Sequence, residues 1–182
     1  IDLFTYENLG SGGAPIPTRS FTKHEEGIWI GYRFFDTFHR QVAYPFGYGL
    51  SYTTFEYHGM TVKRNGNKLV VSVNVKNTGS VAGKEVAQVY VAAPKGRLEK
   101  PAKELKAFAK TRVLKPGESQ TLQMVLEVRD LASYDETNHQ WLADAGTYTF
   151  FVGSNVEDIK GKSTINLPQY TEKTSAALAM KK

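Results

Sequence analysis

The chain has 182 residues, of which 41% are hydrophobic and 23% charged, an ordinary composition for a globular protein with a sizeable core. It contains no cysteine, which excludes disulfide bonds and thiolate metal sites. No apolar run approaches the ~20 residues that a membrane-spanning helix needs. The net charge of +5 is scattered, and the densest basic stretch, residues 95–110, is interrupted by Glu99 and Glu104. We therefore expect no nucleic-acid partner and no membrane.

The first part of the sequence predicts irregular structure. Residues 1–21 contain a glycine-rich run at 10–13 and two prolines, Pro15 and Pro17, with neither alternation nor helical spacing. The chain starts without methionine and without the basic-then-apolar pattern of a signal peptide. An independent domain rarely opens with so long a featureless segment. We therefore expect this chain to be a piece of a longer protein.

Residues 25–36 are apolar at both even and odd positions, so periodicity alone does not separate a buried strand from a short buried helix. A short helix from Gly31 to Asp36 is favoured, because Arg33 and Asp36 then stand at i,i+3 and can pair. A helix this short needs a partner surface. The rest of the chain offers no obvious partner for so many aromatic side chains.

Residues 44–52 read YPFGYGLSY and are the most unusual stretch of the chain. Pro45, Gly47 and Gly49 favour a sharp turn, while the aromatic residues between them are typical of buried positions. A loop of this composition indicates a packed connection that joins two bodies and is held against both.

From residue 55 onward the pattern is that of short β-strands separated by turns. Asn65-Gly66 between two alternating runs is a strong β-hairpin signal. A further strand is expected over residues 105–114, and no convincing helix follows. This pattern predicts an all-β, two-sheet antiparallel sandwich of seven or eight strands. The apolar residues expected to share a face within each strand are Leu69, Val71, Val73 and Val75; Ala87, Val89 and Val91; Leu122, Met124, Leu126 and Val128; Tyr148, Phe150 and Val152; and Ile165 and Leu167.

Three features near the C-terminus refine this prediction. Asp144-Ala145-Gly146-Thr147-Tyr148 has the form of the tyrosine corner of immunoglobulin-like sandwiches, although core packing of Tyr148 is the simpler alternative. Trp141 is interpreted as a core residue rather than an exposed platform for a sugar. Residues 169–182 are polar and then alanine-rich, which predicts a frayed or weakly helical tail.

The sequence shows no arrangement of residues that supports catalysis within this chain. Glycoside hydrolysis usually requires two facing carboxylates, and the only acids in an aromatic neighbourhood are Glu25, Glu26 and Asp36, of which the first two diverge on a strand. Gly47 and Gly49 lack the lysine or third glycine of a phosphate-binding loop. We therefore predict no catalytic, cofactor-binding or metal-binding residue and no cofactor. The histidines, which lack metal-ligand spacing, are His24, His39, His58 and His139.

Several linked motifs resemble glycoside hydrolase family 3 enzymes of the β-glucosidase type. The likeness runs from about residue 23 to residue 167 and follows the order of that family's C-terminal signature and fibronectin type III-like domain. The matching motifs are EGIWIGYRFFD at 26–36, YPFGYGLSYTTF at 44–55, VKNTG at 75–79, AGKEVAQVY at 82–90, PAKELKAF at 101–108, LKPGE at 114–118 and GTY at 146–148.

This resemblance implies a domain organisation and a role. Residues 1–52 resemble the end of an α/β sandwich domain and its linker, 53–168 the fibronectin type III-like sandwich, and 169–182 a flexible tail. In the family the aspartate nucleophile and the glutamate acid/base lie in upstream domains, so no catalytic residue is carried over to this chain. The resemblance implies a retaining β-glucosidase as the parent, with this portion as a scaffold that is inactive alone. Its expected partners are the upstream catalytic domains, a β-glucoside or oligosaccharide through the parent, and a homo-oligomer.

Two other functions stay open at this point. A free-standing module that binds carbohydrate or protein predicts an exposed aromatic row of Tyr90, Tyr134 and Trp141, and an adhesion repeat requires further copies of the sandwich. The polar loop at residues 94–103 is expected either to reach a neighbouring domain or subunit or to lie on the surface alone. The compartment is not determined by the residues; periplasmic or secreted is favoured over cytoplasmic.

Overall fold

A computed structural model describes residues 25–174. The irregular structure expected for residues 1–21 and the alanine-rich end of the tail lie outside these residues. The described part contains one short α-helix, one 3₁₀-helix and ten strands. In chain order they are α1 (Tyr32–Thr37), β1 (Phe55–Asn65), β2 (Lys68–Asn77), β3 (Val86–Ala92), β4 (Glu104–Lys110), β5 (Ser119–Glu127), η1 (Val128–Leu131), β6 (Ser133–Asp135), β7 (Gln140–Ala143), β8 (Gly146–Gly153), β9 (Ile159–Leu167) and β10 (Tyr170–Lys173).

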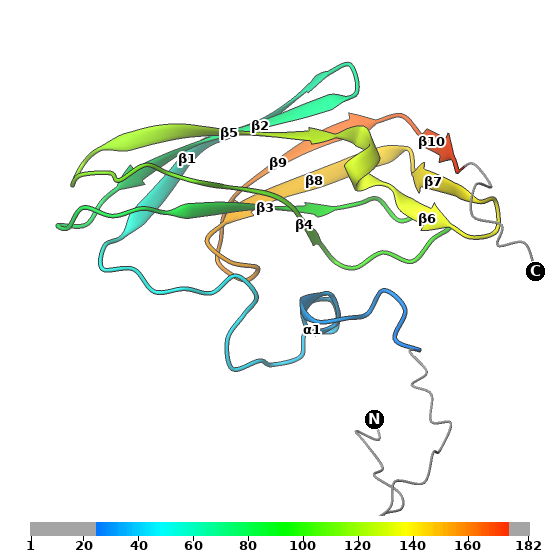
Figure 1. The fold of residues 1–182 in the computed structure, drawn as a ribbon, viewed down its shortest axis with the longest axis horizontal. Helices are drawn as coiled ribbons and strands as arrows, with labels where there is room; N and C mark the ends of the chain where they lie inside the picture. Colours follow the sequence, from blue (N-terminus) through cyan, green and yellow to red (C-terminus); the bar gives the residue numbers. More distant parts are fainter. Residues whose placement is uncertain (1–24, 175–182) are drawn as a thin grey trace, which may run out of the picture.

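The strands form two layers that enclose one core (Figure 1). One sheet has the order β1-β2-β5 and the other the order β4-β3-β8-β9, and all pairings are antiparallel. A small sheet, β10-β7-β6, continues the sandwich at one end (Figure 1). The prediction of an all-β antiparallel sandwich is confirmed.

The β1–β2 hairpin forms as predicted, with its connection one residue later than the Asn-Gly pair. Asn65 pairs with Lys68, so Gly66 and Asn67 make the turn, and Gly66 has a φ of 60° that suits glycine. Along β2, Leu69, Val71, Val73 and Val75 are buried in the core, as the alternation requires.

Strand β3 is buried on both of its faces. Ala87, Val89 and Val91 point into the core as predicted, but Gln88 and Tyr90 on the opposite face are buried as well. A strand of an antiparallel sandwich normally has one solvated face. Additional chain must therefore cover the outer face of this sheet, and residues 25–52 provide it.

The tyrosine corner is confirmed, because the Tyr148 hydroxyl donates a hydrogen bond to the Asp144 carbonyl at 2.8 Å. Burial and the Asp144 carboxylate raise the pKa of Tyr148 to about 12. Trp141 is half-buried instead of lying in the core: its ring packs edge-on against Tyr134, and the Arg129 guanidinium lies 5.0 Å from its centroid.

Three local predictions are wrong. Arg33 does not pair with Asp36. Arg33 pairs instead with Glu104 of β4, and Asp36 pairs with Lys103 of the loop before β4. The strand expected over residues 105–114 is β4, which ends at Lys110 because the chain leaves the ladder there; Leu114 keeps one isolated bridge to Gly83. The tail is ordered over Tyr170–Lys173, where β10 pairs with β7 and gains backbone hydrogen bonds that sequence alone does not reveal.

Candidate functional site

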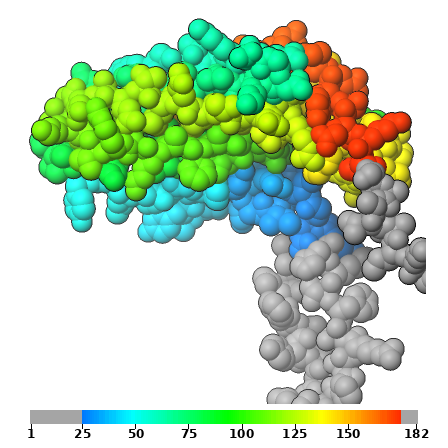
Figure 2. Space-filling view, turned by 45° about the horizontal axis from the view of Figure 1, so that its top comes forward, coloured from blue at the N-terminus to red at the C-terminus, as the bar shows by residue number. Residues whose placement is uncertain are grey.

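The candidate site is the segment of residues 25–52, which runs along the outer face of the four-stranded sheet. In Figure 1 helix α1 and the chain that follows it lie beneath β3 and β4, away from the β1-β2-β5 layer. The space-filling view shows the same residues as a blue and cyan band along one flank of the sandwich (Figure 2). The segment is thus an external layer, and its inner and outer sides meet different surroundings.

Helix α1 is attached to the loop at residues 94–103 and to the start of β4. The Ala102 amide donates a hydrogen bond to Thr37 Oγ1 at 2.9 Å, and the Leu105 amide donates one to the Tyr32 hydroxyl at 2.9 Å. Lys103 Nζ lies 2.6 Å from Asp36 Oδ1. The loop therefore contacts the N-terminal segment of its own chain, so it is not a surface feature alone.

The turn at residues 45–48 is attached to β3 through the side chain of Gln88. The Tyr48 amide donates to the Pro45 carbonyl at 3.0 Å, and Gly47 adopts a φ of 85°. The Gln88 amide nitrogen donates to the Gly47 carbonyl at 3.1 Å and to the Ser154 carbonyl, while its oxygen accepts from the Tyr90 hydroxyl at 2.6 Å. A Cβ atom on Gly47 would lie 2.2 Å from Gln88 Oε1, so any other residue here must displace the Gln88 side chain and adopt a φ that favours glycine.

Part of the aromatic cluster has its partner within the chain, which corrects the expectation that none exists. The Tyr32 ring stacks on Phe46 with centroids 4.3 Å apart and meets Tyr90 edge-on at 6.3 Å. Tyr90 is completely buried, and this burial raises its pKa. The exposed row of Tyr90, Tyr134 and Trp141 that a free-standing binding module requires is therefore broken at Tyr90.

The C-terminal end of the segment is attached by the buried amide of Asn77. Its nitrogen donates to the carbonyls of Val81 and Leu114 at 2.9 and 2.8 Å, and its oxygen accepts from the Thr53 hydroxyl at 2.7 Å and from the Gly79 amide at 3.0 Å. All the hydrogen-bonding capacity of this amide is satisfied. Residues 48–52 thus lie between two attachment points, the Gln88 contact at Gly47 and the Asn77 contact at Thr53.

The outward side of the segment is apolar and exposed. Leu50 is 89% exposed, Tyr52 98% and Tyr44 71%. We call the exposed large apolar side chains of residues 44–52 the docking face; they are Tyr44, Phe46, Tyr48, Leu50 and Tyr52. Tyr44 and Tyr48 pack on one another with centroids 5.1 Å apart. Several exposed large apolar side chains within one short segment are typical of a protein–protein interface.

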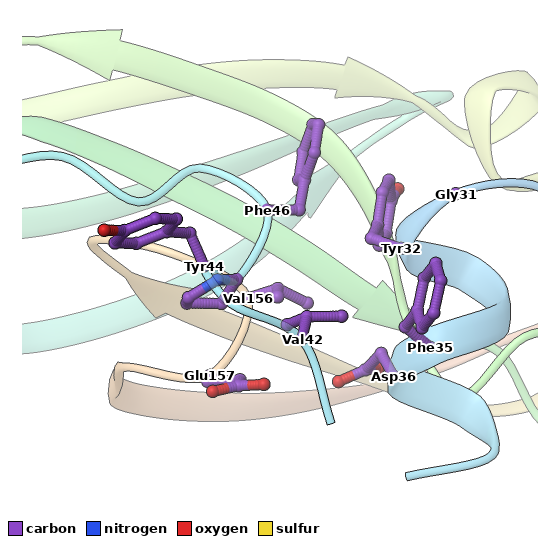
Figure 3. Close-up of a pocket in the computed structure, with 10 residues that line it drawn as sticks. Gly31, Tyr32, Phe35, Asp36, Val42, Tyr44, Phe46, Val156 and Glu157 are labelled. Atoms are coloured by element: carbon purple, nitrogen blue, oxygen red, sulfur yellow. The ribbon is translucent and has the colours of Figure 1, made fainter. Parts of the chain in front are cut away.

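A cavity of about 260 Å³ opens between α1 and the docking face. Its walls are mostly apolar and include Phe35, Val42, Phe46 and Val156 (Figure 3). Asp36 and Glu157 also line it.

The acids and histidines considered from the sequence are not brought together. Glu25 and Glu26 are exposed, Asp36 pairs with Lys103, and His39, His58 and His139 lie apart on the surface, while His24 lies outside the described residues. Among residues 25–174 no three His, Cys, Asp or Glu side chains are close enough to hold a metal ion. None of the helices formed by these residues is long and apolar enough to cross a bilayer. The prediction that the chain holds no catalytic residue stays a prediction.

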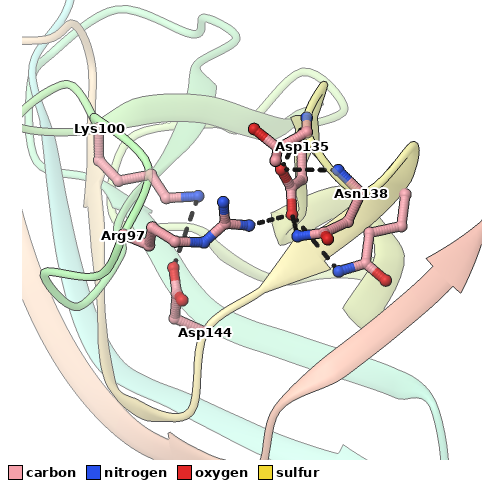
Figure 4. Close-up of polar contacts among 7 residues, drawn as sticks. Arg97, Lys100, Asp135, Asn138 and Asp144 are labelled. Carbon is pink, nitrogen blue, oxygen red and sulfur yellow. Dashed lines mark hydrogen bonds and ion pairs between the residues drawn. The ribbon is translucent and has the colours of Figure 1, made fainter.

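Sequence reasoning missed Asp135, which fastens the 94–103 loop to the β6–β7 hairpin (Figure 4). The carboxylate is fully buried, accepts from the Asn138 side chain at 2.7 Å and from the Thr137 amide at 3.2 Å, and pairs with Arg97. The hydrogen bonds from Asn138 and Arg97 lower the pKa of Asp135 to about 2. Beside it, Lys100 donates to the Ser133 hydroxyl at 2.7 Å. The available sequence signal was an aspartate directly before three polar residues, a pattern typical of a turn.

Asp135→Asn is expected to lower the melting temperature at neutral pH, on the order of 5 °C for a chain of this size. Because the folded-state pKa is depressed, the charge stabilises the fold above the unfolded value near 4 and loses this effect as pH falls toward 2. The difference between wild type and variant should therefore shrink below about pH 4. Circular dichroism melts at several pH values measure this; a constant difference down to pH 2 would contradict the role of the charge.

Comparisons with known proteins match this architecture. The fibronectin type III-like domain family matches residues 85–156. A β-glucosidase of Ruminococcus albus is 44% identical over 86% of this chain and 17% of the relative, and one of Kluyveromyces marxianus is 46% identical over 74% of the chain and 16% of the relative.

Solved structures agree with these relatives. β-Glucosidase 3B from Thermotoga neapolitana, in complex with α-D-glucose, is 49% identical with a TM-score of 0.79, covering 82% of this chain and 21% of that one. The GH3 β-glucosidase of Bifidobacterium adolescentis is 41% identical with a TM-score of 0.76, covering 79% of this chain and 21% of that one. The chain spans only about a fifth of the length of these relatives. The chain therefore contains a fibronectin type III-like domain and is similar to the C-terminal portion of glycoside hydrolase family 3 β-glucosidases.

Proposed function

We propose that this chain is the C-terminal structural portion of a retaining β-glucosidase, that it packs against and stabilises the catalytic domains, and that it is inactive alone. Residues 1–52 form the end of an α/β sandwich domain and the linker, and residues 53–168 form the fibronectin type III-like sandwich. Substrate reaches the enzyme through the catalytic domains, and the present chain contributes no catalytic group.

The docking face is the observation that carries this proposal. Leu50 and Tyr52 are almost fully exposed, although Gln88 and Asn77 hold the backbone on either side of them in place. Burying a large apolar side chain contributes about 1.5–3 kcal/mol, so leaving several of them in water is costly. A surface of this kind is stable when another protein body covers it.

The length of the relatives supports the presence of a protein body large enough to cover the docking face. About four fifths of each relative lies outside the region that this chain matches, and these relatives are β-glucosidases. The family's catalytic machinery belongs to upstream domains. The covering body is therefore the catalytic part of the same enzyme.

Activity of separated and recombined parts tests this function. With an aryl β-glucoside as substrate, the 182-residue chain alone is expected to show no turnover above buffer. The upstream part alone should be weakly active or unstable, and addition of the chain should restore activity in a saturable manner. Turnover by the chain alone would refute the scaffold role. The role would also be refuted if adding the chain changed neither the activity nor the melting temperature of the upstream part.

A further inference from the structure

We propose that the cavity beside α1 receives an arginine side chain from the body that covers the docking face. This inference rests on the proposed function for its partner, and it adds the chemistry by which the partner is recognised. The relevant observations are the shape of the cavity, the two carboxylates that line it, and its continuity with the docking face.

The walls of the cavity suit a long side chain with an aliphatic stem. Phe35 comes from α1, Val42 and Phe46 from the chain after it, and Val156 from the β8–β9 connection (Figure 3). The Val156 amide donates to the Phe46 carbonyl at 3.0 Å, which holds two of these walls together. The cavity is therefore preformed in the chain, and a partner side chain meets little ordering cost on entering it.

The two carboxylates give the cavity its charge preference. In Figure 3 Asp36 and Glu157 lie on the same side of the cavity and point toward one another. Lys103 neutralises Asp36 through Oδ1, but the buried Oδ2 atom accepts no hydrogen bond within the described part of the chain. Glu157 forms no ion pair there either, and neither does Arg40, which lines the adjoining polar depression. Because that oxygen is shielded from solvent, the carboxylate that an incoming cation reaches is that of Glu157, which is exposed.

Arginine fits these walls better than lysine or a neutral residue. Its planar guanidinium stacks on aromatic rings and donates several hydrogen bonds in one plane, so it can lie against Phe35 while it reaches the Glu157 carboxylate at the rim. Lysine presents a compact, strongly hydrated charge and gains less from ring walls. Tyr44 and Phe46 belong to both the docking face and the cavity lining, so one approaching surface can engage both.

Binding of n-butylguanidinium to the 182-residue chain tests the chemistry, with the neutral n-butylurea as its isostere. The methyl resonances of Val42 and Val156 report occupancy of the cavity by NMR titration. The cation is expected to bind about five- to tenfold more tightly than the urea, as a charge-assisted hydrogen bond requires. Glu157→Gln should remove that preference; because Glu157 is exposed, this variant folds normally. Glu136→Gln, an exposed acid on the β6–β7 turn, is the matched control and should retain it.

A second measurement, the affinity of the chain for the upstream part, tests whether the cavity is used in the assembled enzyme. Glu157→Gln should weaken association of the chain with the upstream part about five- to tenfold, whereas Glu136→Gln should not. Equal binding of the two small probes overturns the inference whether or not the chain docks. Docking that is unaffected by Glu157→Gln overturns it too, and leaves the scaffold function intact; absence of docking by the wild-type chain is instead a failure of the proposed function.

Discussion

Replacing Leu50 and Tyr52 together by serine is expected to weaken association of this chain with the upstream part of the enzyme about 100-fold or more. Burial of each large apolar side chain contributes about 1.5–3 kcal/mol, and every 1.4 kcal/mol changes the dissociation constant tenfold. Both side chains are almost fully exposed in the chain itself. The isolated double variant should therefore keep its melting temperature, and its loss should appear only in the complex.

Titration calorimetry of the two parts and the restored turnover of an aryl β-glucoside measure this effect. Val125→Ser is the matched control, because Val125 is also an exposed apolar side chain but lies on β5 in the opposite sheet. The control should bind as the wild type does. Equal binding by the double variant and the wild type would mean that residues 44–52 are not the docking face.

Gly47→Ala is expected to release the turn at residues 45–48 from the sandwich at a cost of about 2–3 kcal/mol. The added Cβ meets the Gln88 side chain at 2.2 Å, and the φ of 85° is unfavourable for alanine. Gln88 must then move, which breaks its bonds to the Gly47 and Ser154 carbonyls and its bond from Tyr90. Tyr90 and Gln88 lose their cover, because the sandwich itself does not bury this face.

Limited digestion with chymotrypsin measures the release, since Phe46 and Tyr48 are cleavage sites once the turn opens. Cleavage after Phe46 and Tyr48 should be about 30- to 150-fold faster in the variant than in the wild type. Gly49→Ala is the control: Gly49 does not have a positive φ, and nothing lies within 4 Å of an added Cβ. If both variants were cut at the same rate, the close contact with Gln88 would not be what holds the turn.

The sandwich was predictable from residue order because its determinants are local. Alternation along β2 places Leu69 and Val71 inward at every second residue, and this follows from strand geometry alone. The tyrosine corner was recognisable for the same reason, since Tyr148 and Asp144 are only four residues apart. The family resemblance also followed from linked motifs within the chain.

Contacts between distant residues were not predictable. Arg33 and Asp36 were expected to pair because they are neighbours on a helix, yet Glu104 and Lys103 lie closer in space. Asp135 gave no sign of its link to Arg97, which is 38 residues away. Residues 170–173 looked like a tail because their strand partner, β7, is nearly thirty residues earlier in the chain.

By itself, the sequence determined the β-sandwich, its turns and the excess of aromatic side chains ahead of it. Only the tertiary structure decided which of those side chains are covered: Tyr32 packs against Tyr90, while Leu50 and Tyr52 stay in water. The physical reason is that strand periodicity is set by neighbouring residues, whereas burial outside a strand depends on what else the folded chain brings to that surface.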